Sequence, residues 1–120
     1  MDLEERALGL LGLATRAGRT APGQDAVRIA ALGGQACLIL LAPDASEGTR
    51  KQVLRLSEKT GVPVRLAGTR ESLGSRTRKA LCSQVAILDR SFADRLVEML
   101  DERETTGGPE PEGSGSRESK

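Results

Sequence analysis

Seven consecutive apolar residues limit the possible folds of this chain more than any other segment. Residues 36–42 read Ala-Cys-Leu-Ile-Leu-Leu-Ala, with no polar residue between them. A strand with one face in water alternates apolar and polar side chains, so an unbroken run suits a strand covered on both faces. We therefore expect helices on both sides of a sheet. Because roughly 20 apolar residues are needed to cross a bilayer, no membrane-spanning segment is expected.

Helical spacing and short apolar segments alternate along the rest of the chain. In residues 2–16, apolar side chains recur at the intervals of an amphipathic helix. Further helices are expected over 24–32, from a cap at Asp44 or Ser46 to Gly61, over 69–74, and from Ser91, with Asp94 three residues on, to Arg103; further strands are expected over 20–21, 62–66 and 85–88. This alternation predicts an α/β protein, an α/β/α sandwich of about 100 residues.

Two glycines interrupt the first predicted helix. Gly9 and Gly12 each cost about 1 kcal/mol relative to alanine in a helix interior. Packing must therefore support this helix, and we expect the close approach of a neighbouring backbone at the glycines. Residues 75–80, which are polar and strongly basic, read as a loop.

The chain divides into one folded domain and a tail. Its 120 residues suffice for one core and are too few for two. Residues 1–103 hold all the predicted elements, whereas residues 104–120 consist of Gly, Pro, Ser, Thr and charged residues without any aliphatic side chain. Such a segment cannot offset the entropy lost on ordering, so we expect it to be disordered.

The residue types that the chain lacks exclude several classes of function. Without histidine it cannot build a Ser-His or Cys-His nucleophile pair or a His-containing zinc site. Phe92 is the only aromatic residue, which excludes RNA sites built on stacked aromatic platforms. Cys37 and Cys82 are too far apart for a C-x-x-C pair and are expected to be reduced thiols of a cytoplasmic protein. We expect no catalytic residue, metal or organic cofactor, and hence no enzyme.

Two features favour RNA as a ligand. The Pro-Gly-Gln-Asp turn at 22–25 opens a predicted helix, where free backbone N–H groups and short polar side chains can meet phosphate oxygens or base edges. Residues 70–79 carry three arginines and one lysine against a single glutamate, although the net charge of the whole chain is only +1. The alternative is that these cations form an ordinary solvated surface.

Six short stretches carry a family resemblance. They are Leu-Gly-Leu-Ala-Thr-Arg-Ala-Gly at 11–18, Pro-Gly-Gln-Asp-Ala-Val at 22–27, Leu-Ile-Leu-Leu-Ala-Pro-Asp-Ala-Ser at 38–46, Gly-Val-Pro-Val at 61–64, Leu-Gly at 73–74 and Val-Ala-Ile at 85–87. In order and spacing the chain resembles the ribosomal L-seven-Ae family, and most of all its small bacterial YlxQ-like members. The resemblance implies a three-layer α/β/α sandwich with a mixed four-stranded sheet. It also implies binding of kink-turn RNA, a bent duplex with tandem sheared G·A pairs.

The resemblance also implies where RNA would be held. In that family the contacts come from the turn that opens the second helix and from the loop before the last strand. The corresponding residues here are Gly23, Gln24, Asp25, Arg28, Arg76, Thr77, Arg78 and Lys79. In the implied mechanism the glycine lets the backbone approach the RNA, the polar residues after it read guanine edges, and the basic residues neutralise phosphates.

The chain departs from the kink-turn binders at the implied contact positions. Asp25 and Ala26 stand where those proteins have Asn-Glu. Ile29 replaces a lysine, with Arg28 beside it, and Arg78 stands where relatives usually have glycine. Because alanine cannot accept a hydrogen bond from guanine with its side chain, we expect looser sequence reading and a stronger dependence on phosphate contacts.

The expected partner is structured RNA, either a kink-turn or ribosomal RNA, in a role associated with the ribosome or translation. The alternative is that the same fold acts as a protein-interaction module on the translation or transcription machinery, with weak or no RNA binding. Ala26 and Ile29 favour this alternative, whereas Gly23 and the basic segment favour RNA.

Overall fold

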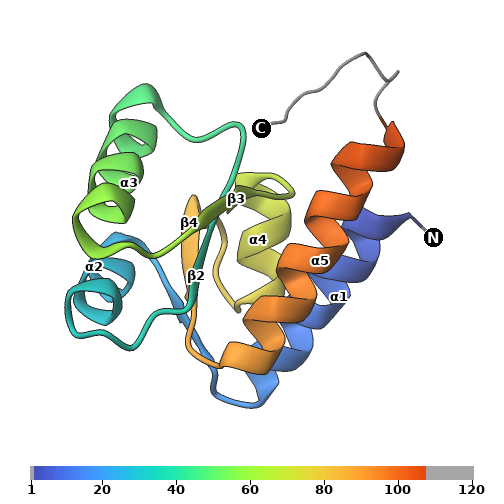
Figure 1. The fold of residues 1–120 in the computed structure, drawn as a ribbon, viewed down its shortest axis with the longest axis horizontal. Helices are drawn as coiled ribbons and strands as arrows, with labels where there is room; N and C mark the ends of the chain where they lie inside the picture. Colours follow the sequence, from blue (N-terminus) through green and yellow to red (C-terminus); the bar gives the residue numbers. More distant parts are fainter. Residues whose placement is uncertain (1, 108–120) are drawn as a thin grey trace.

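The computed structural model describes residues 2–107, and the side chains of residues 2–103 (Figure 1). Every helix and strand expected from the sequence is present. The elements in chain order are α1 (Leu3–Arg16), β1 (Thr20–Pro22), α2 (Gln24–Leu32), β2 (Leu38–Leu41), α3 (Glu47–Thr60), β3 (Val64–Leu66), α4 (Arg70–Arg76), β4 (Gln84–Ile87) and α5 (Arg90–Gly107).

The strands form one mixed sheet in the order β1-β4-β2-β3. β4 runs antiparallel to both β1 and β2, whereas β2 and β3 are parallel. Ala86 of β4 lies opposite Ala21 on one side and Ile39 on the other. β3 lies at the edge, where Pro63, which has no N–H to donate, can directly precede it. The mixed four-stranded sheet implied by the family resemblance is confirmed.

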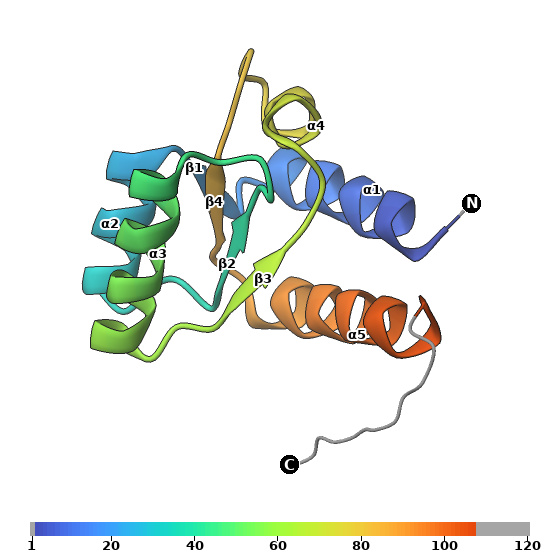
Figure 2. The same cartoon turned by 90° about the horizontal axis from the view of Figure 1, so that it is seen from above.

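Helices cover both faces of this sheet. α2 and α3 lie on one side, and α1, α4 and α5 lie on the other (Figure 2). The side chains of β2 alternate between the two layers: Leu38 and Leu40 pack with the core under α1, α4 and α5, whereas Ile39 and Leu41 pack under α2 and α3. All four are buried, as the unbroken apolar run predicts. The α/β/α sandwich is therefore confirmed.

The residues around Asp44 connect the starts of two helices. Ser46 caps α3, because its Oγ accepts a hydrogen bond from the Thr49 N–H at 3.2 Å. Asp44, the other cap considered from the sequence, accepts instead from the Arg70 N–H at the start of α4, at 2.9 Å. One short loop thus supplies hydrogen-bond acceptors for backbone N–H groups at the starts of both α3 and α4.

The start of α5 differs from the prediction. Asp89, and not Ser91, caps the helix: Asp89 Oδ1 accepts from the backbone N–H groups of Ser91 and Phe92 at 2.9 and 3.0 Å, and also from the Ser91 hydroxyl. The N–H of Phe92 and then the Ser91 hydroxyl are the main causes that lower the pKa of Asp89. A carboxylate at this position satisfies free donors of the first turn and opposes the positive end of the helix dipole.

Two helices end later than expected. α4 continues to Arg76, so that Ser75 and Arg76, expected in a loop, are helical. α5 continues to Gly107, beyond the expected end at Arg103, and the rest of the predicted disordered tail lies outside the described residues. None of the helices in residues 2–107 combines the length and the apolarity that a membrane span requires.

Candidate nucleic-acid interface

The turn between β1 and α2 depends on Gly23. This residue has φ 101° and ψ 159°, a conformation that is open essentially only to glycine. A Cβ added there would meet no atom within 4 Å, so the backbone conformation, and not crowding, requires the glycine. No side chain of the described residues caps α2. The first N–H groups of this helix therefore remain available to an anionic ligand.

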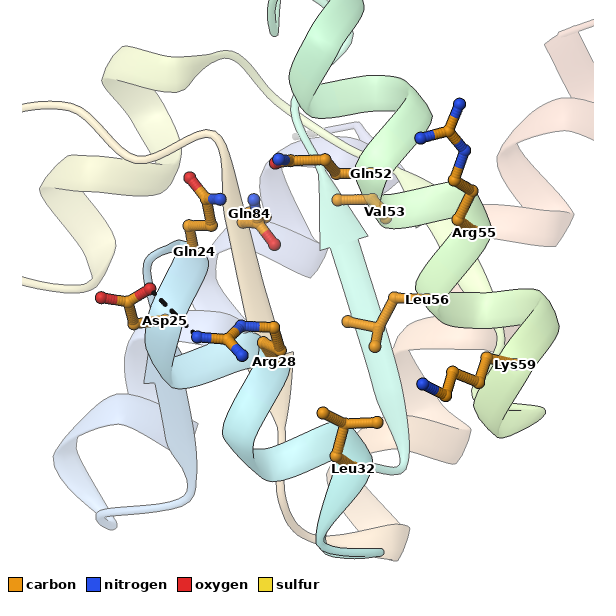
Figure 3. A pocket seen from close by; sticks show the side chains of 10 residues that line it. All are labelled: Gln24, Asp25, Arg28, Leu32, Gln52, Val53, Arg55, Leu56, Lys59 and Gln84. Carbon is orange, nitrogen blue, oxygen red and sulfur yellow. Dashed lines mark ion pairs between the residues drawn. The ribbon is translucent and has the colours of Figure 1, made fainter.

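The polar residues after Gly23 lie on the surface. Gln24, Asp25 and Arg28 are exposed, and Arg28 forms an ion pair with Asp25 at 3.8 Å (Figure 3). An exposed pair of this kind contributes about 0–1 kcal/mol, so Arg28 can exchange its partner for a phosphate at little cost. Ile29, which stands where relatives have lysine, is also exposed, at 65%.

The basic loop that follows α4 is folded back by Gly74. The Gly74 carbonyl accepts hydrogen bonds from the N–H groups of Thr77, at 3.0 Å, and Lys79, at 2.8 Å. A Cβ at this glycine would lie 2.7 Å from the carbonyl oxygen of Lys79 and 2.9 Å from that of Ala80. Such distances are shorter than van der Waals contact, so only glycine lets the loop pack against the helix in this way.

In the loop, the side chain of Thr77 does not face solvent as expected, and Arg78 is exposed but has an unusual backbone conformation. Thr77 is buried, and its hydroxyl donates to the Leu73 carbonyl at 2.8 Å, so this side chain supports the turn and does not face solvent. Arg78 has φ 67° and is the one non-glycine residue with positive φ in the described part of the chain. Its left-handed conformation explains why a glycine would suit this position.

The turn and the basic loop meet at Gln84. The Gly23 N–H donates to the Gln84 carbonyl at 3.0 Å, and the thiol of Cys82 donates to the same oxygen at 3.0 Å. Gln84 begins β4, the strand that the loop enters, so this contact ties the Gly23 turn to the end of the loop.

The arginine side chains at the end of α4 and in the following loop lie against α1. Arg76 and Arg78 line a shallow groove of about 360 Å³ together with Arg16 and Gly12. A Cβ at Gly12 would lie 3.9 Å from Cδ of Arg76, an ordinary van der Waals distance, so packing at this position does not require a glycine. The neighbour of Gly12 is thus a side chain, and not the backbone that was expected. Sequence analysis did not identify Arg16 as a residue of this groove, because its position depends on how α1 and α4 pack.

Ion pairing reduces the set of cations that can bind a ligand. Arg65 pairs with Asp101 at 2.8 Å, and Arg70 lies 3.6 Å from Asp44. By contrast, no ion pair within residues 2–103 involves the three basic residues of the segment 76–79. The basic charge of this region is therefore concentrated in Arg76, Arg78 and Lys79.

Metal coordination receives no support from the described residues. Nowhere among them do three or more His, Cys, Asp or Glu side chains gather as a metal site would require. Cys37 and Cys82 are free thiols, half-buried and buried respectively.

Known proteins share this sequence and this architecture. No protein-family model matches the chain. It is 37% identical over 92 residues to the RNA-binding protein YlxQ of Bacillus subtilis, a match covering 77% of this chain and 92% of that protein.

Two solved structures share the fold. A protein of unknown function from Bacillus halodurans C superimposes with a TM-score of 0.75 and 33% identity, covering 79% of this chain and 96% of that one. The Giardia lamblia 15.5kD RNA binding protein superimposes with a TM-score of 0.68 at 18% identity, covering 86% of this chain and 88% of that one. At this identity the similarity establishes a shared fold and nothing further. On the identity and coverage shared with YlxQ, this chain belongs to the YlxQ-like proteins of the ribosomal L-seven-Ae family.

Proposed function

We propose that this protein binds structured RNA, without catalysis, through the turn that opens α2 and the basic loop after α4. The observation that carries the proposal is the contact at Gln84: the turn before the uncapped N-terminus of α2 is tied to the first residue of β4, and the segment 76–79, shortly before that strand, holds three cations without an ion pair among the described residues. A phosphate backbone that crosses this side of the molecule can contact both segments. Kinship with a protein named as RNA-binding supports this proposal.

The residues divide into three roles in this proposal. Gly23 allows close approach of the backbone, and Gln24 and Asp25 present polar groups to base edges. Arg28, Arg76, Arg78 and Lys79 neutralise phosphates, and each such contact releases counterions from the RNA. Thr77 acts indirectly, by holding the turn of the loop against α4.

The proposed target class is kink-turn-like RNA, read less strictly than by relatives that retain Asn-Glu and lysine in the α2 turn. Ala26 offers no side-chain acceptor, and the loss of one good base contact costs about 1–3 kcal/mol of discrimination. Ile29 offers no charge. Contacts between the cations of the segment 76–79 and RNA phosphates therefore contribute the larger part of the binding free energy.

A titration against two RNAs tests the proposal. Purified protein is titrated with a consensus kink-turn RNA and with a plain duplex of equal length, at fixed Mg²⁺ and two salt concentrations. Binding that weakens as salt rises supports an RNA-binding function, and preference for the kink-turn supports the proposed target class. Absence of binding to either RNA at the lower salt concentration contradicts the proposed function.

A second candidate function is docking of a protein partner of the translation or transcription machinery on α2. It is favoured by Ile29 and Leu32, which are 65% and 50% exposed on this helix. An Ile29→Lys substitution separates the two functions. It should raise RNA affinity if α2 faces phosphate, and it should leave RNA binding negligible if this face serves a protein.

A further inference from the structure

We propose that the groove between α2 and α3 is a nucleotide-binding site, which takes one unpaired nucleobase together with its phosphate. The nucleotide can be an unpaired residue of the bound RNA or a free mononucleotide, because the groove offers both the same chemistry. In its RNA form this site deepens the proposed function and rests on it.

The groove has the size and the walls of a small-ligand site. Its volume is about 490 Å³, within the roughly 300–1,000 Å³ typical of such sites. Leu32 of α2 and Val53 and Leu56 of α3 provide apolar walls (Figure 3). These walls can cover the faces of a planar ring.

A buried carboxamide lies at the base of the groove. Gln84 is only 4% exposed, and its side-chain amide has no hydrogen-bond partner in the described part of the chain. Because side chains alternate along β4, Gln84 faces the same layer as Ala86, which packs under α2 and α3. A buried polar group without a partner is costly, so this amide points to a ligand that supplies both an acceptor and a donor.

Two further carboxamides line the same groove. Gln24 stands in the first turn of α2, and Gln52 extends from α3 toward Gln24 and Gln84 in the close-up (Figure 3). Each carboxamide offers one carbonyl acceptor and an NH₂ donor in a plane. The edge of a nucleobase presents donors and acceptors in the same planar arrangement. Three glutamines around one apolar groove therefore favour a base over a purely apolar ligand.

Cations along the groove supply the second half of the site. Arg28, Arg55 and Lys59 line it, against the single carboxylate of Asp25, which is already paired with Arg28. Arg55 and Lys59 have no ion pair within residues 2–103. These two side chains can neutralise a phosphate. The guanidinium of Arg55 can also stack on the face of a base, a contact for which the groove has no aromatic side chain.

The direct test uses a fluorescent nucleotide. The protein has no Trp or Tyr, so 2-aminopurine riboside 5′-monophosphate can be followed without protein background, with the four natural mononucleotides as competitors. Saturable binding is expected, weakened about tenfold or more by Gln84→Leu and by the pair Arg55→Ala/Lys59→Ala. The control pair Arg50→Ala/Lys51→Ala removes equal charge from α3 outside the groove and should leave binding unchanged.

Folding is checked in the same variants. Gln84→Leu removes an unpartnered buried amide and should melt no lower than the native protein. If that variant does not fold, Gln52→Ala, on the exposed face of α3, provides the same test of the amides. The inference is overturned if no nucleotide binds saturably, if the amide variants bind as well as the native protein, or if the control pair weakens binding equally.

An RNA arm separates the two sources of the nucleotide. A duplex with one unpaired nucleotide is compared with a fully paired duplex of the same length, and preference for the first should disappear in Gln84→Leu. If both duplexes bind equally and no mononucleotide binds, the groove assignment fails while the proposed RNA-binding function stands. If mononucleotides bind and neither duplex nor kink-turn RNA does, the groove assignment stands and the RNA-binding function fails.

Discussion

Gly23 and Arg78, in the two segments of the proposed interface, share a positive φ but differ in chemistry. Both have positive φ, 101° at Gly23 and 67° at Arg78. The glycine removes the strain and leaves open space beside the backbone. The arginine retains a strain of about 1–2 kcal/mol and adds a cation. The comparison teaches that the α2 turn is suited to close backbone approach, whereas the loop gives up stability for charge.

Removing the charge of the loop should have the largest effect. In the triple variant Arg76→Ala, Arg78→Ala, Lys79→Ala, we expect RNA affinity to fall about 100-fold or more, and the slope of log affinity against log salt to decrease by about 2 to 3. Stability should barely change, because none of the three has an ion pair among the described residues. Filter binding across a salt series and chemical denaturation measure both effects.

A control variant shows whether the effect depends on where the three charges lie. Arg50→Ala, Lys51→Ala, Arg90→Ala removes the same charge from α3 and the start of α5, and should retain nearly native affinity. Equal losses in the two triple variants would mean that RNA senses only the total charge of the protein.

Changing Gly23 should produce the opposite pattern. Gly23→Ala is expected to lower the free energy of unfolding by about 1–3 kcal/mol, because alanine is strained at φ 101° and ψ 159°. RNA affinity should also fall, but with an unchanged salt slope, since no charge is removed. As a control, Gly48→Ala lies in α3 with nothing within 4 Å of the added Cβ and should be neutral or stabilising by up to about 1 kcal/mol. An unchanged stability in Gly23→Ala would refute the conformational role of this glycine.

Arg78→Gly tests the exchange of stability for charge directly. It should raise the free energy of unfolding by up to about 1 kcal/mol and weaken RNA binding in the same protein. Lys79→Gly removes an equal charge at a residue without positive φ, and should weaken binding while lowering stability. If Arg78→Gly is no more stable than the native protein, the left-handed arginine carries no strain.

The smallest effect on binding is expected at the cap of α5, away from both segments. Asp89→Ala removes the acceptor for the N–H groups of Ser91 and Phe92, so it should lower the thermal midpoint at neutral pH and leave RNA affinity unchanged. The pKa of Asp89 is lowered in the folded state, so its stabilising effect is complete above the ordinary pKa of aspartate. The difference between the two proteins should shrink as pH falls through the lowered pKa. A pH series of thermal melts measures this.

Much of the fold follows from local patterns in the sequence. The apolar run at 36–42 predicts a strand covered on both faces, and the turn glycines predict where helices begin and end. The cap at Ser91 was wrong because α5 begins earlier, at Arg90, and its first N–H groups, those of Ser91 and Phe92, donate to Asp89. α4 continues past its expected end at Gly74 to Arg76, and the absence of a side chain at Gly74 lets the following loop fold back beside the last turn.

The site is less accessible to sequence reasoning than the fold. The turn and the basic segment can be identified from their residue types, but their meeting at Gln84 depends on strand order. Burial of Thr77 follows from how the loop packs on α4, and the position of Arg16 follows from packing of α1 against α4. The contact at Gln84 and the position of Arg16 depend on contacts between segments distant in sequence, which periodicity and local caps do not encode.

The strand order also has a consequence for synthesis of the protein. β4 is the last strand to be translated, yet it lies between β1 and β2, so β1 has no partner until residues 84–87 have left the ribosome. The same residues supply Gln84, to which the Gly23 turn is tied. Such long-range pairing forms late. A nascent chain therefore lacks an anchored α2 turn until β4 emerges, so the proposed RNA-binding surface is complete only when nearly all of the domain has been synthesised.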